Sequence, residues 1–271
     1  MRGVPVIDSP VAPIPVNTTT LALAAVFGLL MGSAVTAIAH RVPRDISWFH
    51  GRSRCPNCQH VLSPLDLFPV FSWVFSLGKC RYCRAPIAWR YPLTELLCAV
   101  WTVLLAQKIG FHATFPLLAI WGYLMIALLW IDLDFQLLPD VLTFPGTLIG
   151  LAAAALVPGG ARVALWGVIM GSGLLWLLAW GYFRLRKIEG MGGGDIKLAA
   201  MFGVVLGWQG ALVTLFISAV VGSVWGGLLM LRGKGDSLTA IPFGTLLAPA
   251  AMVVFLWGDR WLNAYVGLFR N

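Results

Sequence analysis

The chain has 271 residues, of which 59% are hydrophobic and only 11% are charged, and its formal net charge is +8. A soluble globular protein is excluded, because so few polar residues could not cover its surface. The basic residues are spread over several loops and form no cationic stripe, so the charge does not indicate nucleic-acid binding. The sequence therefore predicts an all-α polytopic integral membrane protein.

Eight apolar runs predict about eight transmembrane helices. A helix that crosses about 30 Å of hydrocarbon needs roughly 20 apolar residues. The run 196–207 is too short for a full crossing, so the glycine-rich segment before it is expected to dip toward membrane depth. The other runs are 18–40, 92–109, 112–131, 141–157, 162–183, 209–231 and 241–258.

The segments between and around these runs set the predicted domain boundaries. Residues 1–17 are rich in Pro and Val and have no helical or strand period, which predicts a disordered tail. Residues 18–40 are the first helix, and 41–91 are the one sizeable loop outside the membrane. Residues 92–258 are a transmembrane core with short connectors, and 259–271 are a C-terminal tail.

The first apolar run is interpreted as an uncleaved anchor rather than a signal peptide. Four arginines follow it within residues 41–54, and such a flank resists translocation. Loops rich in Lys and Arg are retained in the cytoplasm. With the N-terminus outside, the inner loops 41–91, 184–197 and 232–240 hold 14 of the 19 basic residues. The sequence therefore predicts that the large loop is cytoplasmic.

The loop 41–91 has too few apolar residues for a core of its own, so it needs a staple. Two CxxC pairs, CPNC and CRYC, could hold a closed tetrahedral Zn²⁺ site. Disulfides are disfavoured in a reducing cytoplasm, and a redox CxxC normally begins a helix in a βαβ unit. His60 is interpreted as a surface residue and Cys98 as a small buried hydrophobe. The predicted structural zinc ligands are Cys55, Cys58, Cys80 and Cys83.

Three acids follow the third apolar run in the segment IDLDFQLLPD, residues 131–140. Asp132 and Asp134 would lie about 200° apart around a helix, so they cannot both face one partner. Asp140 follows Pro139, a good position for an N-cap. Asp132 is at the C-terminal end of a helix, where the macrodipole disfavours an anion. Its place at membrane depth therefore points to a function.

A fourth acid, Asp195, follows three glycines in the segment EGMGGGDIKLAA, residues 189–200. Two interpretations stay open: Asp195 caps the short helix that follows, with the glycines as a linker, or it is a functional acid. The second accounts for the glycines, because glycine tolerates φ > 0 and lets an extended substrate strand approach closely. A phosphate-binding loop is disfavoured, since no Walker pattern is present. The glycines are Gly192, Gly193 and Gly194.

Asp132 and Asp195 lie on separate predicted helices at the same membrane boundary, which suggests a dyad. Two adjacent carboxylates cannot both ionise cheaply, so one is held protonated. The charged one can take a proton from a water that attacks a peptide carbonyl, and the protonated one can assist the carbonyl oxygen and the leaving amine. This chemistry is that of an aspartyl protease.

Six segments of the chain together resemble a known family. GSAVTAIAHRVPRD, SRCPNCQHVLSPLDLFPVFSW, GKCRYCRAPIAWRYPLTE, IDLDFQLLPDVLT, GMGGGDIKLAA and IPFGTLLAPA occur in this order between residue 32 and about 251. They resemble the bacterial type IV prepilin peptidases of the GxGD aspartyl protease family. The resemblance implies a bifunctional inner-membrane enzyme that cleaves the basic leader of type IV prepilins and type II pseudopilins after a glycine. It then methylates the new N-terminal residue, usually Phe, with S-adenosylmethionine.

The resemblance assigns roles to individual residues. The catalytic pair falls on Asp132 and on Asp195, and the zinc ligands fall on the four cysteines of the loop. Glu95, in RYPLTE, becomes a candidate near the methyl-donor site, while its alternative interpretation is an acid at a helix start. The implied partners are prepilin or pseudopilin substrates and the lipid bilayer, with no nucleic acid. Leader recognition is expected to be local, through Glu189 or the acids around Asp134.

One departure from the family pattern lies in the N-terminal half. The family usually reads GSFLN where this chain has GSAVT, so Ala34 and Thr36 replace Phe and Asn. This leaves open a relative that is only a protease, with an inactive methyltransferase half. A non-enzymatic transporter or scaffold is a further alternative, but transporter sites favour the bilayer midplane, whereas these acids cluster at one face. The sequence does not indicate the oligomeric state.

Overall fold

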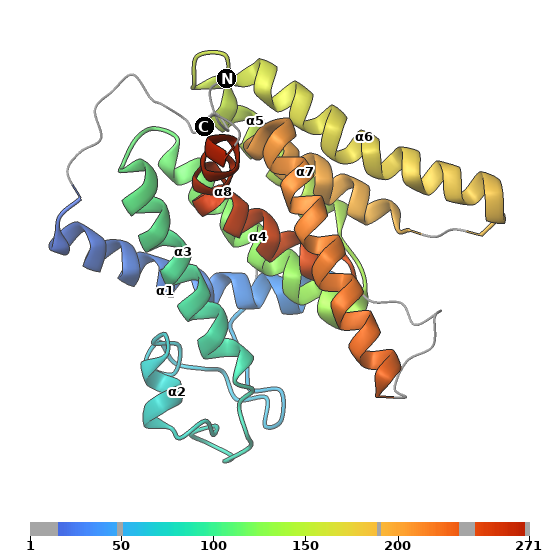
Figure 1. The fold of residues 1–271 in the computed structure, drawn as a ribbon. Helices are drawn as coiled ribbons and strands as arrows, with labels where there is room; N and C mark the ends of the chain where they lie inside the picture. The colour runs from blue at the N-terminus through green and yellow to red at the C-terminus, as the bar shows by residue number, and fades with distance from the viewer. Residues whose placement is uncertain (1–15, 48–50, 189–190, 233–241, 269–271) are drawn as a thin grey trace. The chain divides into compact units, whose positions relative to one another are not determined.

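The computed structural model describes residues 16–47, 51–188, 191–232 and 242–268. The predicted tail 1–17 lies almost entirely outside these ranges, as does Glu189. The chain folds into two compact units, one made by Pro13–Phe111 and the other by His112–Asn271. Figure 1 colours both units along the chain.

The N-terminal unit is a helix pair with a long loop between its members. α1 (Thr18–Arg41) begins at a capping box in which Asn17 accepts from the Thr20 backbone N–H. It packs against α3 (Arg90–Ile109), and the loop between them holds the short helices η1 (Val42–Arg44) and α2 (Phe71–Phe75). A Cβ at Gly32 would overlap Glu95, so the two helices touch through their backbones.

The C-terminal unit is a bundle of five helices in which α7 packs against α5, α6 and α8, and α4 packs against α5 and α8. Trp121 of α4 is fully buried, donates a hydrogen bond from Nε1 to the Met201 carbonyl oxygen at 2.9 Å, and faces the Phe255 ring at 6.1 Å. These contacts join α4 to α7 and α8 and place the core there. The helices are α4 (Phe115–Phe135), α5 (Asp140–Ala155), α6 (Gly160–Arg186), α7 (Gly193–Leu231) and α8 (Gly244–Leu268).

α7 consists of two helices that meet at a sharp bend. Gly207 has φ 67° and ψ 179°, a backbone conformation that interrupts the helix and that L side chains rarely adopt. The first part is too short to cross a membrane at about 1.5 Å per residue. In Figure 1 the bend lies near α5, and both ends of α7 point away from it in the same general direction. The short run predicted to end at 207 is thus confirmed as a separate helix.

The predicted fold class is confirmed. With α7 counted as two, the described residues hold eight helices longer than ten residues. Five of the described helices are long and apolar enough to span a membrane, judged by length and composition. The last helix continues to Leu268, so residues 259–268 of the predicted C-terminal tail are helical and extend α8.

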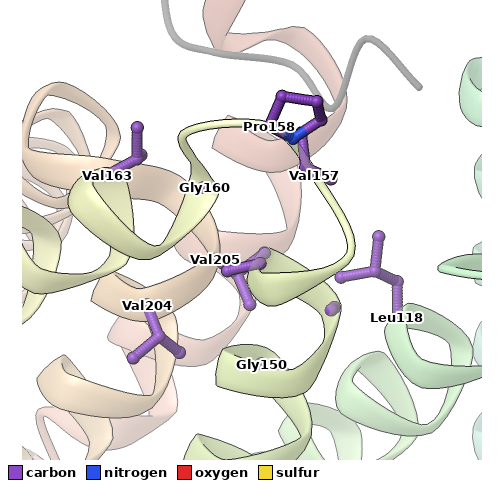
Figure 2. Close-up of a pocket in the computed structure, with 10 residues that line it drawn as sticks. Leu118, Gly150, Val157, Pro158, Gly160, Val163, Val204 and Val205 are labelled. Atoms are coloured by element: carbon purple, nitrogen blue, oxygen red, sulfur yellow. The ribbon is translucent and has the colours of Figure 1, made fainter. Parts of the chain in front are cut away.

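A small apolar hollow of about 40 Å³ lies at the turn between α5 and α6. Figure 2 shows Val157 and Pro158 on the turn, with Val204 and Val205 of α7 on the opposite side. No polar side chain lines it, and it lies at the end of α5 opposite to Asp140. It is a gap in the packing beside the bend in α7, with no group that could do chemistry.

Gly167 of α6 is expected to be essential for the contact between α6 and α7. A Cβ at this position would overlap the Gly203 carbonyl oxygen, whereas a Cβ at Gly173 on the same helix would meet nothing within 4 Å. We expect Gly167→Ala to destabilise the unit by about 1–3 kcal/mol, the usual cost of overpacking. Unfolding of the purified protein in detergent would measure this. Gly173→Ala is the matched control, and an equal loss in both variants would contradict the prediction.

Candidate active site and cysteine loop

The two predicted catalytic aspartates lie at one end of the C-terminal unit, on different helices. Asp132 is near the C-terminus of α4 and is 4% exposed, and Asp195 is in the first turn of α7 and is 9% exposed. Leu138 packs against both Gly194, the residue before Asp195, and Gly244, whose backbone lies beside Asp132 Oδ2, so the two acids flank the same side chain. Asp195 is not the N-cap of α7, because Gly192 occupies that position. The structure thus brings together the two acids that the sequence pairs.

Asp132 is held by the first turn of α8. The Thr245 backbone N–H donates to Asp132 Oδ2 at 2.6 Å, and the Thr245 hydroxyl donates to the same oxygen at 2.9 Å. The N-terminus of a helix carries partial positive charge. The N-terminus of α8 therefore stabilises a negative charge on Asp132, whereas the C-terminal end of α4 disfavours it. Sequence analysis missed Thr245, although a Gly-Thr pair before an apolar run is a helix-start signal.

The glycines beside Asp195 permit close packing rather than an unusual backbone. Gly192 has φ −69°, so the left-handed conformation expected for this segment is absent at that residue. A Cβ at Gly194 would lie 2.9 Å from Leu138, and one at Gly244 would lie 3.0 Å from both Leu138 and Asp132 Oδ2. At Gly193 nothing lies within 4 Å of the added Cβ. Leu138 therefore fills the space between the starts of α7 and α8, and Gly193 faces open space.

The other two acids of the segment 131–140 do not join the pair. Asp134 is exposed on the last turn of α4. Asp140 is the first residue of α5 and makes no capping hydrogen bond, so its predicted role as an N-cap is wrong. Its carboxylate instead pairs with Lys197 Nζ of α7 at 2.6 Å. The pair is about half exposed and ties the starts of α5 and α7 together.

The four cysteines of the loop converge on one point. Their sulfur atoms all lie within 4.8 Å of one another, and Cys55 Sγ and Cys83 Sγ are 3.8 Å apart. Tetrahedral zinc with Zn–S bonds of about 2.3 Å needs sulfur atoms about 3.8 Å apart. None of the five cysteines forms a disulfide, and Cys98 is buried in α3 away from the cluster. The residues present therefore fit a zinc ion.

The two CxxC knuckles have the same backbone geometry. In each, the N–H of the first cysteine donates to a carbonyl five residues later, and the fourth residue after it, Gln59 or Arg84, takes a left-handed conformation. Hydrogen bonds from Asn57 and from the Ala85 backbone lower the pKa of Cys83 to about 6. A thiolate is the form that binds a metal, so the loop already favours that form at one of its ligand positions.

Asp66 connects the second knuckle to the segment that follows the first. Its Oδ2 accepts hydrogen bonds from the Ser63 backbone N–H at 2.9 Å, the Ser63 hydroxyl at 2.7 Å and the Tyr82 hydroxyl at 3.0 Å. Burial opposes ionisation of Asp66, but these hydrogen bonds outweigh it and hold its pKa below the ordinary value. The His60 ring contacts the Tyr82 ring, with centroids 3.7 Å apart and planes tilted by 31°, and His60 lies outside the set of sulfur ligands. Sequence analysis missed Asp66, which no local motif marks.

Glu95 connects the loop to α3. It is 8% exposed, and its Oε2 accepts a hydrogen bond from the Val70 backbone N–H at 2.7 Å. It is the sixth residue of α3 and therefore lies beyond the first turn, so the interpretation as a helix-start acid is wrong. Thr36 lies one turn after Gly32, which touches Glu95, and its hydroxyl bonds the Gly32 carbonyl. Thr36, one of the two departures from the family pattern, thus lies one turn from the contact between α1 and α3, and Ala34, the other, is exposed.

Two buried aspartates at one end of a helical membrane bundle, together with a four-cysteine loop on a separate helix pair, define a membrane-embedded enzyme of the aspartic-protease type. Comparison with known proteins identifies the family. Residues 26–109 match the bacterial peptidase A24 N-terminal domain, and residues 119–227 match the type IV leader peptidase family. No solved structure matches the chain.

Relatives described as prepilin leader peptidase/N-methyltransferase match over nearly the full length. One from Stutzerimonas stutzeri is 37% identical over 91% of this chain and 94% of the relative. Others from Aeromonas hydrophila and Pseudomonas aeruginosa are 38% and 36% identical over 87% and 88% of this chain, and each match covers 91% of the relative. The chain therefore belongs to the type IV leader peptidase family, as its motifs predict.

Proposed function

We propose that this protein cleaves the leader peptide of type IV prepilins or type II pseudopilins after a glycine and then N-methylates the new N-terminal residue. Family membership and the burial of Asp132 and Asp195 on either side of Leu138 support this proposal. We further propose a bacterial inner membrane location, with the N-terminus outside and the cysteine loop and aspartates at the cytoplasmic face. The distribution of Lys and Arg supports that orientation.

The surroundings of the aspartates favour different roles in peptide hydrolysis. Two donors and the start of α8 favour the ionised form of Asp132. Asp132 would act as the base that takes a proton from the attacking water. Asp195, buried beside this negative charge, would hold a proton, donate a hydrogen bond to the scissile carbonyl oxygen and then protonate the leaving amine.

The position of the pair fits a substrate that is half in the membrane. The segment to be cut would have an apolar helix in the bilayer and a basic leader in the cytoplasm. Asp132 and Asp195 lie at helix ends and not at helix centres. The ends of membrane-spanning helices are where water and lipid meet. Gly193, beside open space, would let the extended peptide pass close to Asp195.

The N-terminal unit is proposed to serve the methylation. Cys55, Cys58, Cys80 and Cys83 would hold Zn²⁺, which closes the loop and leaves no open position for water. S-adenosylmethionine would supply the methyl group, and Glu95 is the candidate residue near its site. One Glu95 oxygen already accepts a hydrogen bond from the Val70 N–H, so Glu95 would contribute to methylation mainly by positioning the loop. A protease-only relative stays the alternative.

Incubation of the detergent-purified enzyme with a prepilin and labelled S-adenosylmethionine tests the proposal. Mass spectrometry should show loss of the leader and one added methyl on the new N-terminus. A prepilin whose glycine before the cut site is replaced by a bulky residue is the control and should remain uncut. Cleavage without methylation would favour the protease-only alternative. Absence of both reactions would overturn the proposal.

Thr245→Val is expected to slow leader cleavage about ten-fold, the usual effect of removing one hydrogen bond to a charged group. The hydroxyl that holds Asp132 Oδ2 is lost, while the backbone donor and the side-chain volume remain. The measurement is kcat for cleavage. Thr245→Ser keeps both donors and should retain a rate within about two-fold of wild type. Equal losses in the two variants would show that packing, and not the hydrogen bond, is responsible.

A further inference from the structure

The cysteine loop carries a continuous row of exposed aromatic rings. The Phe68 and Phe71 centroids are 5.6 Å apart, and those of Phe71 and Phe75 are 6.4 Å apart. These side chains are 55%, 50% and 83% exposed, and Leu77, at 83%, follows the row. Contiguous apolar surface of this kind on a polar loop marks a site of interaction. Nothing in the proposed chemistry of the loop uses it.

The contact with Glu95 fixes where this row lies along α3. Val70 directly precedes α2, and its N–H bonds Glu95, the sixth residue of α3. At about 1.5 Å per residue, Glu95 is only about 7.5 Å along the helix from its start. α3 is long and apolar enough to span a membrane. α2 is therefore held near the end where α3 enters the bilayer, as Figure 1 shows for this unit.

The turn before α2 is held in an unfavourable conformation. Val70 has φ 60° and ψ −51°, and the Phe71 N–H bonds the Pro69 carbonyl at 2.6 Å, which makes Val70 the centre of a γ-turn. A β-branched residue is strained in this region and persists there only where its surroundings impose it. The bond to Glu95 is one such constraint. It fixes the direction in which α2 leaves the turn.

The charge of the loop matches an anionic membrane surface. Residues 41–91 hold eight Lys or Arg against two Asp. Arg52, Arg54, Lys79, Arg81 and Arg84 are all exposed. Aromatic rings at headgroup depth with flanking Lys and Arg are the pattern of interfacial segments, and each cation near an anionic leaflet strengthens the binding.

We propose that α2 and the row Phe68–Phe71–Phe75 insert into the interfacial layer of the bilayer and dock the cysteine loop on anionic lipid. This goes beyond the proposed function and rests on it only for the choice of the cytoplasmic leaflet. Glu95 sets the depth of α2, and the basic residues of the loop bind lipid headgroups. The cysteine loop is thereby held against the membrane surface.

Photocrosslinking of the full-length enzyme tests this docking. Benzoylphenylalanine replaces Phe75, and the matched control carries it at Gln59, an exposed position on the first cysteine knuckle. Both proteins are placed in nanodiscs of phosphatidylcholine with about one quarter anionic phosphatidylglycerol. After irradiation, mass spectrometry identifies what each probe has captured. The experiment does not require catalytic activity, so its outcome is independent of the proposed function.

We expect the probe at 75 to form phospholipid adducts at least several-fold more often than the probe at 59. Crosslinks from 75 mainly to peptides of 112–268, or to a second copy of the chain, would overturn the proposal, as would equal lipid adducts at both positions. As a second measurement, Phe75→Asp should speed hydrogen exchange of residues 66–79 in these nanodiscs. Leu185→Asp, at a leucine 85% exposed on α6, should leave that exchange unchanged.

Discussion

Asp132→Asn and Asp195→Asn will each reduce leader cleavage by about 10³-fold or more, because each removes a group that accepts or donates a proton in hydrolysis. Asparagine has nearly the same shape, so the fold should persist. Methylation of a peptide supplied without its leader should continue, because both aspartates lie in the C-terminal unit. The measurement is single-turnover cleavage of a prepilin, with methyl transfer to the pre-cut peptide followed in parallel.

Asp134→Asn provides the matched control for the catalytic pair. It makes the same chemical change two residues from Asp132, on the exposed side of α4. With saturating prepilin it should cleave within about three-fold of wild type, because a residue that only helps to recognise the leader changes KM rather than the chemical step. If Asp132→Asn or Asp195→Asn cleaves as fast as Asp134→Asn, the two buried acids are structural and the assigned mechanism is wrong.

The second large effect is expected at the cysteine cluster. Cys80→Ser should lower bound zinc from about one per chain to nearly none and should unfold the loop 51–89. The loop lacks an apolar core, and structural zinc in small domains contributes about 10–16 kcal/mol of apparent binding energy to folding. Metal analysis of the purified protein, with hydrogen exchange of the loop peptides, measures both effects. Methylation should be lost with the loop.

Cys98→Ala is the control that removes a cysteine outside the cluster. Cys98 is buried in α3 and is not among the four converging sulfur atoms. This variant should keep one zinc per chain and the protection of the loop. In both variants the helices of 112–268 should exchange as in wild type. A zinc content near zero in folded, active wild-type enzyme would refute the assignment of the metal.

Much of the architecture could be read from hydropathy and charge. A helix in lipid must satisfy its own backbone hydrogen bonds, so an apolar run of sufficient length has one available structure. The break at Gly207 was visible because the runs on either side of it are separate. The extension of α8 to Leu268 was not visible, since residues 259–268 include charged and polar side chains that end the apolar run.

The candidate site was only partly visible. The spacing of the cysteines predicts a metal site, and the membrane depth of Asp132 and Asp195 predicts a catalytic pair. The structure brings each set of side chains together. Their zinc-binding and catalytic roles stay predictions. Thr245 was missed because it lies 113 residues from the acid it holds. Asp140 was misassigned because its partner Lys197 outcompetes the local cap, and that pairing depends on where α7 begins.

The sequence by itself determined the membrane class, the helices and the residues able to do chemistry, because these follow from local apolar length, charge and the reactivity of side chains. Tertiary structure alone decided that α8 holds Asp132, that Glu95 bonds the turn before α2, and that glycines let α6 and α7 meet. Those contacts join residues distant in the chain, and their geometry depends on how whole helices pack.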